Sequence, residues 1–280
     1  MSNGVITSDF TLAGHAGTIV GTSWRLERPR WIAVLVHGYG EHVGRYGWVA
    51  ARLNEAGASV YAADHAGHGR SDGERVLIRD FEPVVEDVDR VLDHALEQDP
   101  GLPVALIGHS MGGMIAARST QRFGARLAAT VLTGPVLGRW ETIEELLALP
   151  SIPHTPIDPD TLSRDPEVGA AYAADPLVWH GDFKRPTLQA FHDEMQRITI
   201  VGHVGRSPLL HLHGEDDRLV PLETSAAGLA KIAGTATESR TYPGARHEIL
   251  NEINRGEVMA DVLAFLARYL PVETGGRRGA

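Results

Sequence analysis

The segment Gly108-His-Ser-Met-Gly112 has the residue types and spacing of a hydrolytic nucleophile. It directly follows an apolar run at 104–107, and a helical pattern begins at once after it. In this strand–turn–helix context, glycines on either side of a serine permit a tight turn that exposes the hydroxyl above a sheet. The helix start also directs free N–H groups at a developing oxyanion. The sequence therefore predicts Ser110 as a nucleophile for acyl transfer; the alternative is a Gly-rich packing turn.

A serine hydroxyl is a weak nucleophile near neutral pH, so it needs a general base that a third group orients. Proteins with such a serine turn carry the three residues in the chain order serine, acid, histidine. An apolar run at 208–212 precedes the acidic cluster Glu215-Asp-Asp217, and His247 is the only histidine after that cluster. Chain order therefore predicts His247 as the base and leaves the acid open among the three carboxylates.

The expected oxyanion donors lie in two glycine-containing turns. The loop His37-Gly-Tyr-Gly-Glu-His42 follows the apolar run Trp31–Val36, and its glycines allow the backbone to pass close to a bound acyl group. The backbone N–H groups of Tyr39 and Met111 are the predicted pair, and one such donor is typically worth about 3 kcal/mol of transition-state stabilisation. The alternative is that the glycines of this loop only form a turn.

The other histidines near these segments have structural interpretations. His211 and His213 alternate on one strand, a spacing compatible with metal binding. No third convergent ligand can be identified in the sequence, so packing within the strand or its loop is favoured and no metal is expected. His42 and His109 are expected in the wall of the pocket and not as bases.

Composition narrows the class of protein. The 280 residues include 26 Lys and Arg against 36 Asp and Glu, a formal net charge of −10, so nucleic-acid binding is not expected. The chain has no cysteine, which excludes disulfides, thiolate nucleophiles and cysteine-based zinc sites. The first 25 residues lack a signal-peptide pattern, and no apolar run approaches the roughly 20 residues of a membrane helix. A cytoplasmic protein is predicted, with contact to membranes at most at their surface.

Alternating apolar runs and helical patterns predict the elements that position these residues. An antiparallel edge hairpin is expected near 9–12 and 18–24. Runs typical of strands buried on both faces follow at 31–36, 59–63, 103–107, 128–133, 208–212 and 238–242. Helical stripes lie between them, which favours an α/β fold with a mostly parallel sheet and helices on both faces.

One long stretch, 137–205, interrupts this alternation. It contains many prolines and short helical patterns but no buried-strand run, and it is far too long for an ordinary connection. We expect an insertion packed over the carboxyl edge of the sheet, where open α/β sheets bind ligands. The predicted organisation is a core domain formed by 1–136 and 206–270, the insertion at 137–205, and a flexible tail at 271–280.

Five motifs stand out along the chain: His37-Gly-Tyr-Gly-Glu-His-Val-Gly-Arg-Tyr46, Asp64-His-Ala-Gly-His-Gly-Arg-Ser71, Gly108-His-Ser-Met-Gly-Gly113, Ala171-Tyr-Ala-Ala-Asp-Pro-Leu177 and His213-Gly-Glu-Asp-Asp-Arg-Leu219. In these motifs and their order the chain resembles the monoacylglycerol lipase family of α/β-hydrolases. The likeness extends from about residue 22 to residue 270, and the motifs are specific when taken together. The resemblance implies the α/β-hydrolase fold with a lid over the site, hydrolysis of a single acyl chain from glycerol, and no cofactor.

The resemblance also assigns individual residues. Asp217, immediately before Arg218-Leu219, matches the family's catalytic aspartate better than the two acidic residues before it. In that family the polar end of the pocket binds the glycerol hydroxyls. The matching positions here are Glu41, Arg45, His109 and Tyr172. For the first two of these, a rim ion pair is the alternative.

The lid helix is where the chain departs from the family. Family lids usually carry a long apolar helix that enters the membrane interface. The corresponding stretch here, 142–149, is followed by Pro150, so only about two amphipathic turns are available. A stripe this short is more often packed on its own core than inserted in lipid. The sequence therefore predicts neither strong membrane attachment nor a preference for long acyl chains.

Together these features predict a serine hydrolase that cleaves carboxylic esters through an acyl-enzyme, with a monoacylglycerol as the expected substrate. A general carboxylesterase or lysophospholipase is the nearest alternative, because the three catalytic residues do not read the leaving group. The remote alternative is a non-catalytic ligand-binding protein of the same fold. Such proteins usually lose one of the three residues, and all three are present here. A homodimer is compatible with the sequence.

Overall fold

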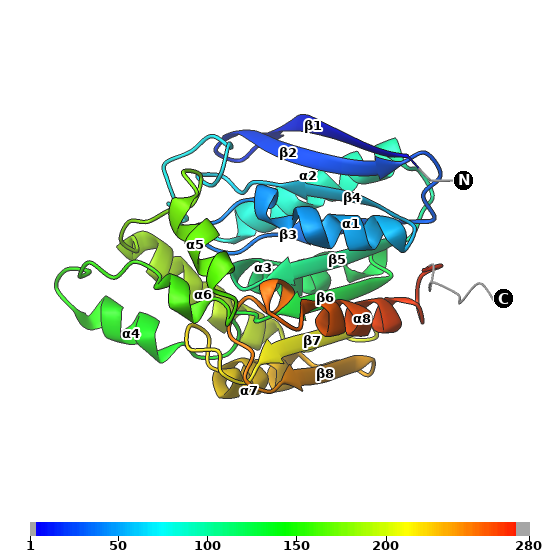
Figure 1. Ribbon diagram of the computed structural model, residues 1–280. Helices are drawn as coiled ribbons and strands as arrows, with labels where there is room; N and C mark the ends of the chain where they lie inside the picture. The colour runs from blue at the N-terminus through cyan, green and yellow to red at the C-terminus, as the bar shows by residue number, and fades with distance from the viewer. Residues whose placement is uncertain (1–3, 273–280) are drawn as a thin grey trace.

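The computed structural model describes residues 4–272, which contain one eight-stranded sheet. The strands are Val5–Gly14 (β1), Gly17–Leu26 (β2), Trp31–Val36 (β3), Ala58–Ala63 (β4), Val104–His109 (β5), Ala129–Thr133 (β6), Leu209–Gly214 (β7) and Thr237–Tyr242 (β8). Their order in the sheet is β1-β2-β4-β3-β5-β6-β7-β8 (Figure 1). The pairs β1–β2 and β2–β4 are antiparallel and all others are parallel. The predicted mostly parallel sheet with an antiparallel edge hairpin is confirmed.

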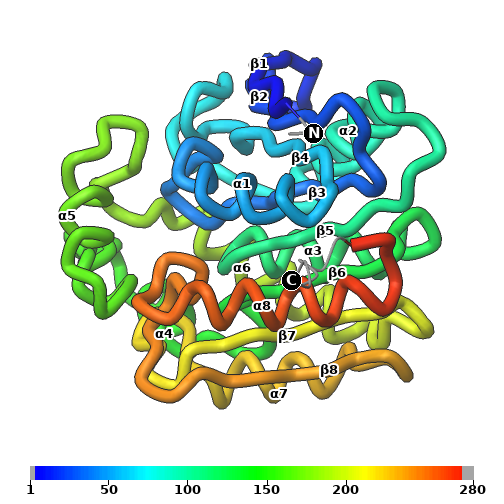
Figure 2. The backbone as a smooth tube through the Cα atoms, turned by 45° about the vertical axis from the view of Figure 1, so that its right-hand side comes forward, coloured from blue at the N-terminus to red at the C-terminus, as the bar shows by residue number. Residues whose placement is uncertain are grey.

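Helices cover both faces of this sheet (Figures 1 and 2). They are Gly47–Glu55 (α1), Glu82–Gln98 (α2), Met111–Phe123 (α3), Glu141–Ala148 (α4), Pro166–Ala174 (α5), Arg185–Val201 (α6), Leu222–Ile232 (α7) and Arg255–Leu266 (α8). Helices α1 and α8 contribute to the apolar core on one face, and α2, α3 and α7 to the core on the other. None of the helices among residues 4–272 is long and apolar enough to cross a bilayer.

The continuous apolar run of β3 follows from its central position. Successive side chains of a strand point to opposite faces. Ile32 and Val34 accordingly pack in one core and Trp31 and Ala33 in the other, all of them buried. The edge strand β8 is different, because Glu238 and Arg240 are exposed. The expectation that 238–242 is a buried run is therefore wrong: an edge strand with one neighbour does not need apolar side chains on both faces.

Between β6 and β7 the chain leaves the sheet and forms α4, α5 and α6, which extend beyond one end of the strands (Figure 1). Helix α4 ends before Pro150, as the sequence predicts. Helix α6 has 17 residues, so the expectation of only short helices in this stretch is wrong. The boundaries of the insertion at 137–205 and its role as a lid stay predictions. Of the predicted tail at 271–280, residues 273–280 lie outside the described residues.

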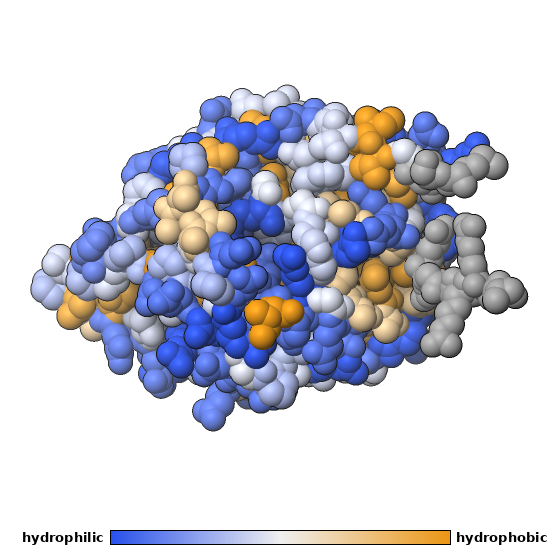
Figure 3. Space-filling view, viewed as in Figure 1, coloured by the Kyte–Doolittle hydropathy of each residue, from blue (hydrophilic) through white to orange (hydrophobic). Residues whose placement is uncertain are grey.

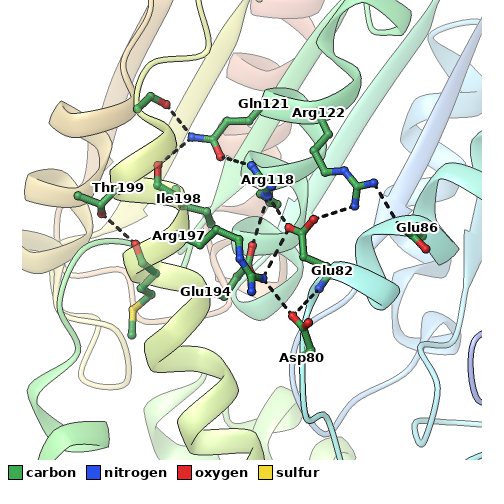
Figure 4. Close-up of polar contacts among 12 residues, drawn as sticks. Asp80, Glu82, Glu86, Arg118, Gln121, Arg122, Glu194, Arg197, Ile198 and Thr199 are labelled. Carbon is green, nitrogen blue, oxygen red and sulfur yellow. Dashed lines mark hydrogen bonds and ion pairs between the residues drawn. The ribbon is translucent and has the colours of Figure 1, made fainter.

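An ion-pair cluster joins α6 to the core (Figure 4). Glu82 of α2 accepts hydrogen bonds from Arg118 and Arg122 of α3, at 2.5 and 3.0 Å. Glu194 of α6 is fully buried, accepts a hydrogen bond from Arg197 at 2.5 Å, and lies 3.7 Å from the Arg118 guanidinium. Helix α6 is therefore held against α3, the helix that begins immediately after Ser110.

Candidate active site

Ser110 occupies a sharp turn between β5 and α3. Its φ of 55° and ψ of −118° lie in a region that non-glycine residues rarely adopt. A Cβ on Gly108 would lie 2.2 Å from the Gly112 carbonyl oxygen, and a Cβ on Gly112 would lie 2.1 Å from the Val36 carbonyl oxygen. Only glycine fits at these two positions, which explains the motif. The predicted strand–turn–helix context of Ser110 is therefore present.

Asp217 and His247 come together at the carboxyl ends of β7 and β8. The Nδ1–H of His247 donates to Asp217 Oδ2 at 2.8 Å, and both side chains are buried. The other oxygen of Asp217, Oδ1, accepts hydrogen bonds from the backbone N–H groups of Leu219 and Val220, both at 2.9 Å. His247 lines the same cavity as Ser110. The structure thus brings the three predicted residues to one place.

The two other acidic residues of the cluster point elsewhere. Glu215 is exposed and accepts a hydrogen bond from the Thr241 hydroxyl at 2.7 Å. Asp216 is exposed and pairs with Arg218 at 3.4 Å. The geometry therefore favours Asp217 as the acid, in agreement with the assignment that the family resemblance implies.

Burial and charge act on the pKa values of this pair in opposite directions. Burial disfavours the charged imidazolium of His247, but the Asp217 carboxylate outweighs it and holds the pKa of His247 above its usual value. Burial also disfavours the Asp217 carboxylate, yet the interactions with His247 and His213 hold the pKa of Asp217 well below its usual range. Asp217 is therefore charged over the range where His247 titrates.

His213 contacts Asp217, a role that the sequence does not indicate. Its Nε2 lies 2.8 Å from the Val220 carbonyl oxygen and 3.1 Å from Asp217 Oδ2. Both neighbours are acceptors, so Nε2 carries the proton and is shared between them. His211 instead packs between the hydroxyls of Ser225 and Ser239. Within residues 4–272 neither histidine belongs to a cluster that could hold a metal ion.

Glu41 fixes the loop that carries Tyr39. Its Oε1 accepts the Gly38 N–H at 2.6 Å and the Tyr46 hydroxyl at 2.7 Å. The Tyr39 side chain lines the cavity and stacks on Phe183, with ring centroids 4.8 Å apart. On the other side of the site, Met111 is the first residue of α3, so its N–H has no acceptor one turn earlier in the helix. The two predicted oxyanion donors thus belong to segments that border the cavity.

The predicted polar end of the pocket is built around Arg45. Its guanidinium donates to both carboxylate oxygens of Glu248, at 2.6 and 2.8 Å, and to Glu41 at 2.8 Å. Its guanidinium carbon lies 5.1 Å from the centre of the Tyr172 ring. Glu248 is buried and was not predicted from the sequence, although it directly follows His247. The two carboxylates and one guanidinium leave one net negative charge near His247.

His109 and Tyr172 offer polar atoms to a ligand. His109 Nδ1–H donates to the Thr133 carbonyl oxygen at 3.0 Å, so its Nε2 carries a lone pair. Burial and the neighbouring His247 lower the pKa of His109 to about 4, which keeps the ring neutral. The Tyr172 hydroxyl is buried without a hydrogen-bond partner among the described residues. Both side chains line the cavity that contains Ser110.

The cavity itself has a volume of about 280 Å³ and a lining of two kinds. Its polar lining includes the Arg45 group, His109 and Tyr172. Its apolar lining includes Trp140 and Leu146 from the α4 region and Phe191 from α6. An elongated ligand with one polar and one alkyl end matches this lining, and Ser110 lies on the wall of the same cavity.

Fold and site together define an α/β-hydrolase. A family model described as "Serine aminopeptidase, S33" matches residues 27–254. Monoacylglycerol lipase from Mycolicibacterium smegmatis is 38% identical over 94% of this chain and 98% of its own. The monoacylglycerol lipase structure from Paleococcus ferrophilus superposes with a TM-score of 0.74 at 26% identity, covering 95% of this chain and 99% of that one. A Bacillus coagulans carboxyl esterase in complex with glycerol gives 0.81 at 27% identity, with 94% and 98% covered. The chain belongs to the monoacylglycerol lipase family.

Proposed function

We propose that the protein hydrolyses monoacylglycerols to a fatty acid and glycerol through an acyl-enzyme on Ser110. The observation that carries the proposal is the buried His247–Asp217 pair, whose histidine borders the same cavity as the strained Ser110 turn. The family relatives named monoacylglycerol lipase support the same substrate class. The apolar and polar parts of the cavity lining suit an acyl chain and a glycerol head group.

The reaction begins with proton transfer from Ser110 Oγ to His247 Nε2 as the oxygen attacks the ester carbonyl. The N–H groups of Tyr39 and Met111 stabilise the oxyanion of the tetrahedral intermediate. His247 then returns the proton to the glycerol oxygen, which leaves. Water, activated by the same imidazole, hydrolyses the acyl-enzyme. Asp217 holds the Nδ1–H tautomer of His247 and stabilises the imidazolium while it carries the proton.

The polar residues around Arg45 have distinct roles in this proposal. The Glu41 carboxylate is already occupied by Gly38, Tyr46 and Arg45, so it positions the loop of Tyr39 and holds the guanidinium. The neutral Nε2 of His109 is free to accept a hydrogen bond from a glycerol hydroxyl, and the Tyr172 hydroxyl can donate one. In this proposal Glu41 and Arg45 therefore form an ion pair that also shapes the polar part of the substrate pocket.

The first test is Ser110→Ala. We expect this variant to fold but to lose nearly all hydrolysis of p-nitrophenyl butyrate and of a monoacylglycerol, because the nucleophile is gone. Ser119→Ala is a matched control, since Ser119 is buried on the same helix away from the cavity and its hydroxyl has no partner among the described residues. Wild-type turnover in Ser110→Ala would contradict the assignment.

The alternatives are separated by two further measurements. A fluorophosphonate probe labels a competent Ser110 but not a ligand-binding protein without activity. A substrate panel of monoacylglycerols, lysophospholipids, simple alkyl esters and aminoacyl p-nitroanilides then distinguishes the proposed activity from that of a lysophospholipase, a general carboxylesterase or an aminopeptidase. We expect the highest kcat/KM for monoacylglycerols, because only they match both parts of the cavity lining.

Contact with membranes is proposed to be weak and confined to the surface, and the proposed location is the cytoplasm. Figure 3 shows a mostly hydrophilic face with separate apolar patches, one of them at the α4 end. Leu149, which follows α4, is 44% exposed. One short helix with few exposed apolar residues supports transient binding to a lipid surface rather than stable insertion. Sedimentation with lipid vesicles tests this proposal. Sedimentation of the same protein without vesicles tests whether it forms a homodimer.

A further inference from the structure

A second cavity lies between α6, α7 and the segment that precedes α4. Its volume is about 490 Å³. Its apolar lining comes from Met195 and Ile200 of α6 and Ala227 of α7, together with the alkyl stem of Lys231. Ile200 is 82% exposed, so the cavity opens to solvent at that end.

The side chain of Trp140 lines both cavities. Helix α6 also borders both: Phe191 lines the first cavity and Met195, one turn later, lines the second. Trp140 meets Phe191 edge to face, with ring centroids 5.9 Å apart. On α4, Leu146 lines the first cavity and Glu144 the second. The indole of Trp140 is therefore shared by the walls of the two spaces.

The indole is not fixed by a hydrogen bond. Its Nε1 atom is buried and has no partner among residues 4–272, although the side chain as a whole is only partly buried. A buried N–H without an acceptor carries a cost in free energy. Rotation of the ring toward solvent gives this N–H a water partner and removes that cost. Rotation of the Trp140 side chain, which separates the two cavities, is therefore favoured by the hydrogen bond that its N–H gains.

The second cavity suits an alkyl chain better than a charged ligand. Of the charged residues that line it, Arg139 and Glu144 already pair with each other at 2.5 Å, and Lys231 is exposed. The apolar residues named above remain available to bury methylene groups. At the shared Trp140 the second cavity also borders the apolar lining of the first, where the acyl chain of a bound ester lies in the proposed function.

We propose that Trp140 is a gate in the acyl path, and that the end of a long acyl chain passes it to lie between α6 and α7. This inference rests on the proposed function, because the occupant is the chain of the ester held at Ser110. Short acyl chains end within the first cavity and do not displace the indole. The position of Trp140 thereby sets which chain lengths the enzyme accepts. On this proposal the enzyme accepts long acyl chains, a preference that the short α4 does not predict.

The test compares palmitoyl with butyryl esters in variants that fill the second cavity. Ala227→Trp and Thr199→Trp place an indole there from exposed positions on α7 and α6. Each is expected to lower the palmitoyl-to-butyryl ratio of kcat/KM by about tenfold, the effect of leaving about two methylene groups in water. Ala230→Trp, exposed on α7 but outside the cavity, is the matched control and leaves the ratio unchanged.

Trp140→Ala removes the gate and is expected to raise the same ratio several-fold. An unchanged ratio in both cavity-filling variants, or a wild type that hydrolyses butyryl but not palmitoyl esters, overturns the inference. A wild type that hydrolyses neither ester overturns the proposed function instead. Hydrolysis of the butyryl ester by the two cavity-filling variants and by Ala230→Trp shows that the site at Ser110 is intact in them.

Discussion

In the proposed mechanism His247 acts as a base only while its imidazole is neutral, so the environment that sets its pKa also sets the pH range of activity. The Asp217 carboxylate and, more weakly, Glu248 and Glu41 favour the charged ring against the effect of burial. The pKa of His247 therefore lies above 6.5, its ordinary value. As a result, kcat/KM is expected to fall as the pH drops through this raised pKa, because the base becomes protonated.

Asp217→Asn separates these contributions. Loss of the carboxylate removes both the tautomer control and the largest favourable charge, so kcat is expected to fall by roughly 10⁴ and the acid limb of the pH profile to move to lower pH. The measurement is kcat/KM for a water-soluble ester from mildly acid to mildly alkaline pH. Glu215→Gln, at the exposed neighbour, is the control. A loss of similar size in this variant would contradict the assignment of Asp217 as the acid.

The sequence predicts some residues of the site and misses others for a physical reason. Ser110 and His247 follow from a local motif and from chain order. Glu248 and His213 acquire their roles only when distant segments meet, Glu248 at Arg45 and His213 at Asp217. No local pattern distinguishes a glutamate that pairs with an arginine about two hundred positions earlier from one that faces solvent.

Helix α6 shows the same limit for a whole element. Its buried residues Leu188, Phe191, Met195 and Ile198 form one stripe at helical spacing. The prolines before it and the lack of buried-strand runs predict an insertion of short helices, whereas this apolar stripe is typical of one long helix. The ion pairs of Figure 4 could not be predicted, because they depend on where α6 docks against α2 and α3.

Docking of α6 is expected to depend on pH through Glu194. Burial and the nearby Glu82 raise the pKa of Glu194 to about 7, despite Arg197 and Arg118. A carboxyl group whose pKa is raised on folding stabilises the folded state below its ordinary pKa of 4.5, and this stabilisation is lost as the pH rises toward 7. Relative to Glu194→Gln, the wild type should therefore lose stability between these two pH values.

The measurement is the difference in the free energy of unfolding between the wild type and Glu194→Gln at several pH values. The difference is expected to decline from pH 4.5 to about 7 and to be constant above that range. Glu86→Gln removes a half-exposed carboxylate of the same cluster and serves as the control. A pH-independent difference for Glu194→Gln would show that this carboxyl group is not perturbed by folding.

At the scale of the whole molecule, buried neutral histidines limit stability in acid. Burial lowers the pKa of His68 and His109 to about 4 and that of His211 to about 3. Unfolding exposes these rings, which then bind protons near their ordinary pKa of 6.5. The unfolded state therefore takes up more protons, and the free energy of unfolding should fall as the pH drops from 6.5 toward 4.

Denaturant unfolding followed at several pH values measures this slope. Glu194 and His247, whose pKa values are raised on folding, act in the opposite direction, but they are two groups against three histidines, so a net fall remains. His211→Gln keeps a polar side chain between Ser225 and Ser239 and is expected to flatten the slope. A slope unchanged by this substitution would place the proton uptake elsewhere.

The overall fold was easier to predict than these details, because alternating runs and glycine turns are visible without knowing which side chains meet.

The backbone of Ser110 implies a trade-off between stability and catalysis. A serine at φ 55° holds roughly 1–3 kcal/mol of conformational strain that a glycine there would largely avoid. Ser110→Gly and Ser110→Ala are both expected to be inactive, but the glycine variant should unfold at a temperature at least about 2 °C higher. Differential scanning calorimetry of the pair measures this gap. The strained turn that keeps the Ser110 hydroxyl exposed above the sheet thus lowers the unfolding temperature of the enzyme.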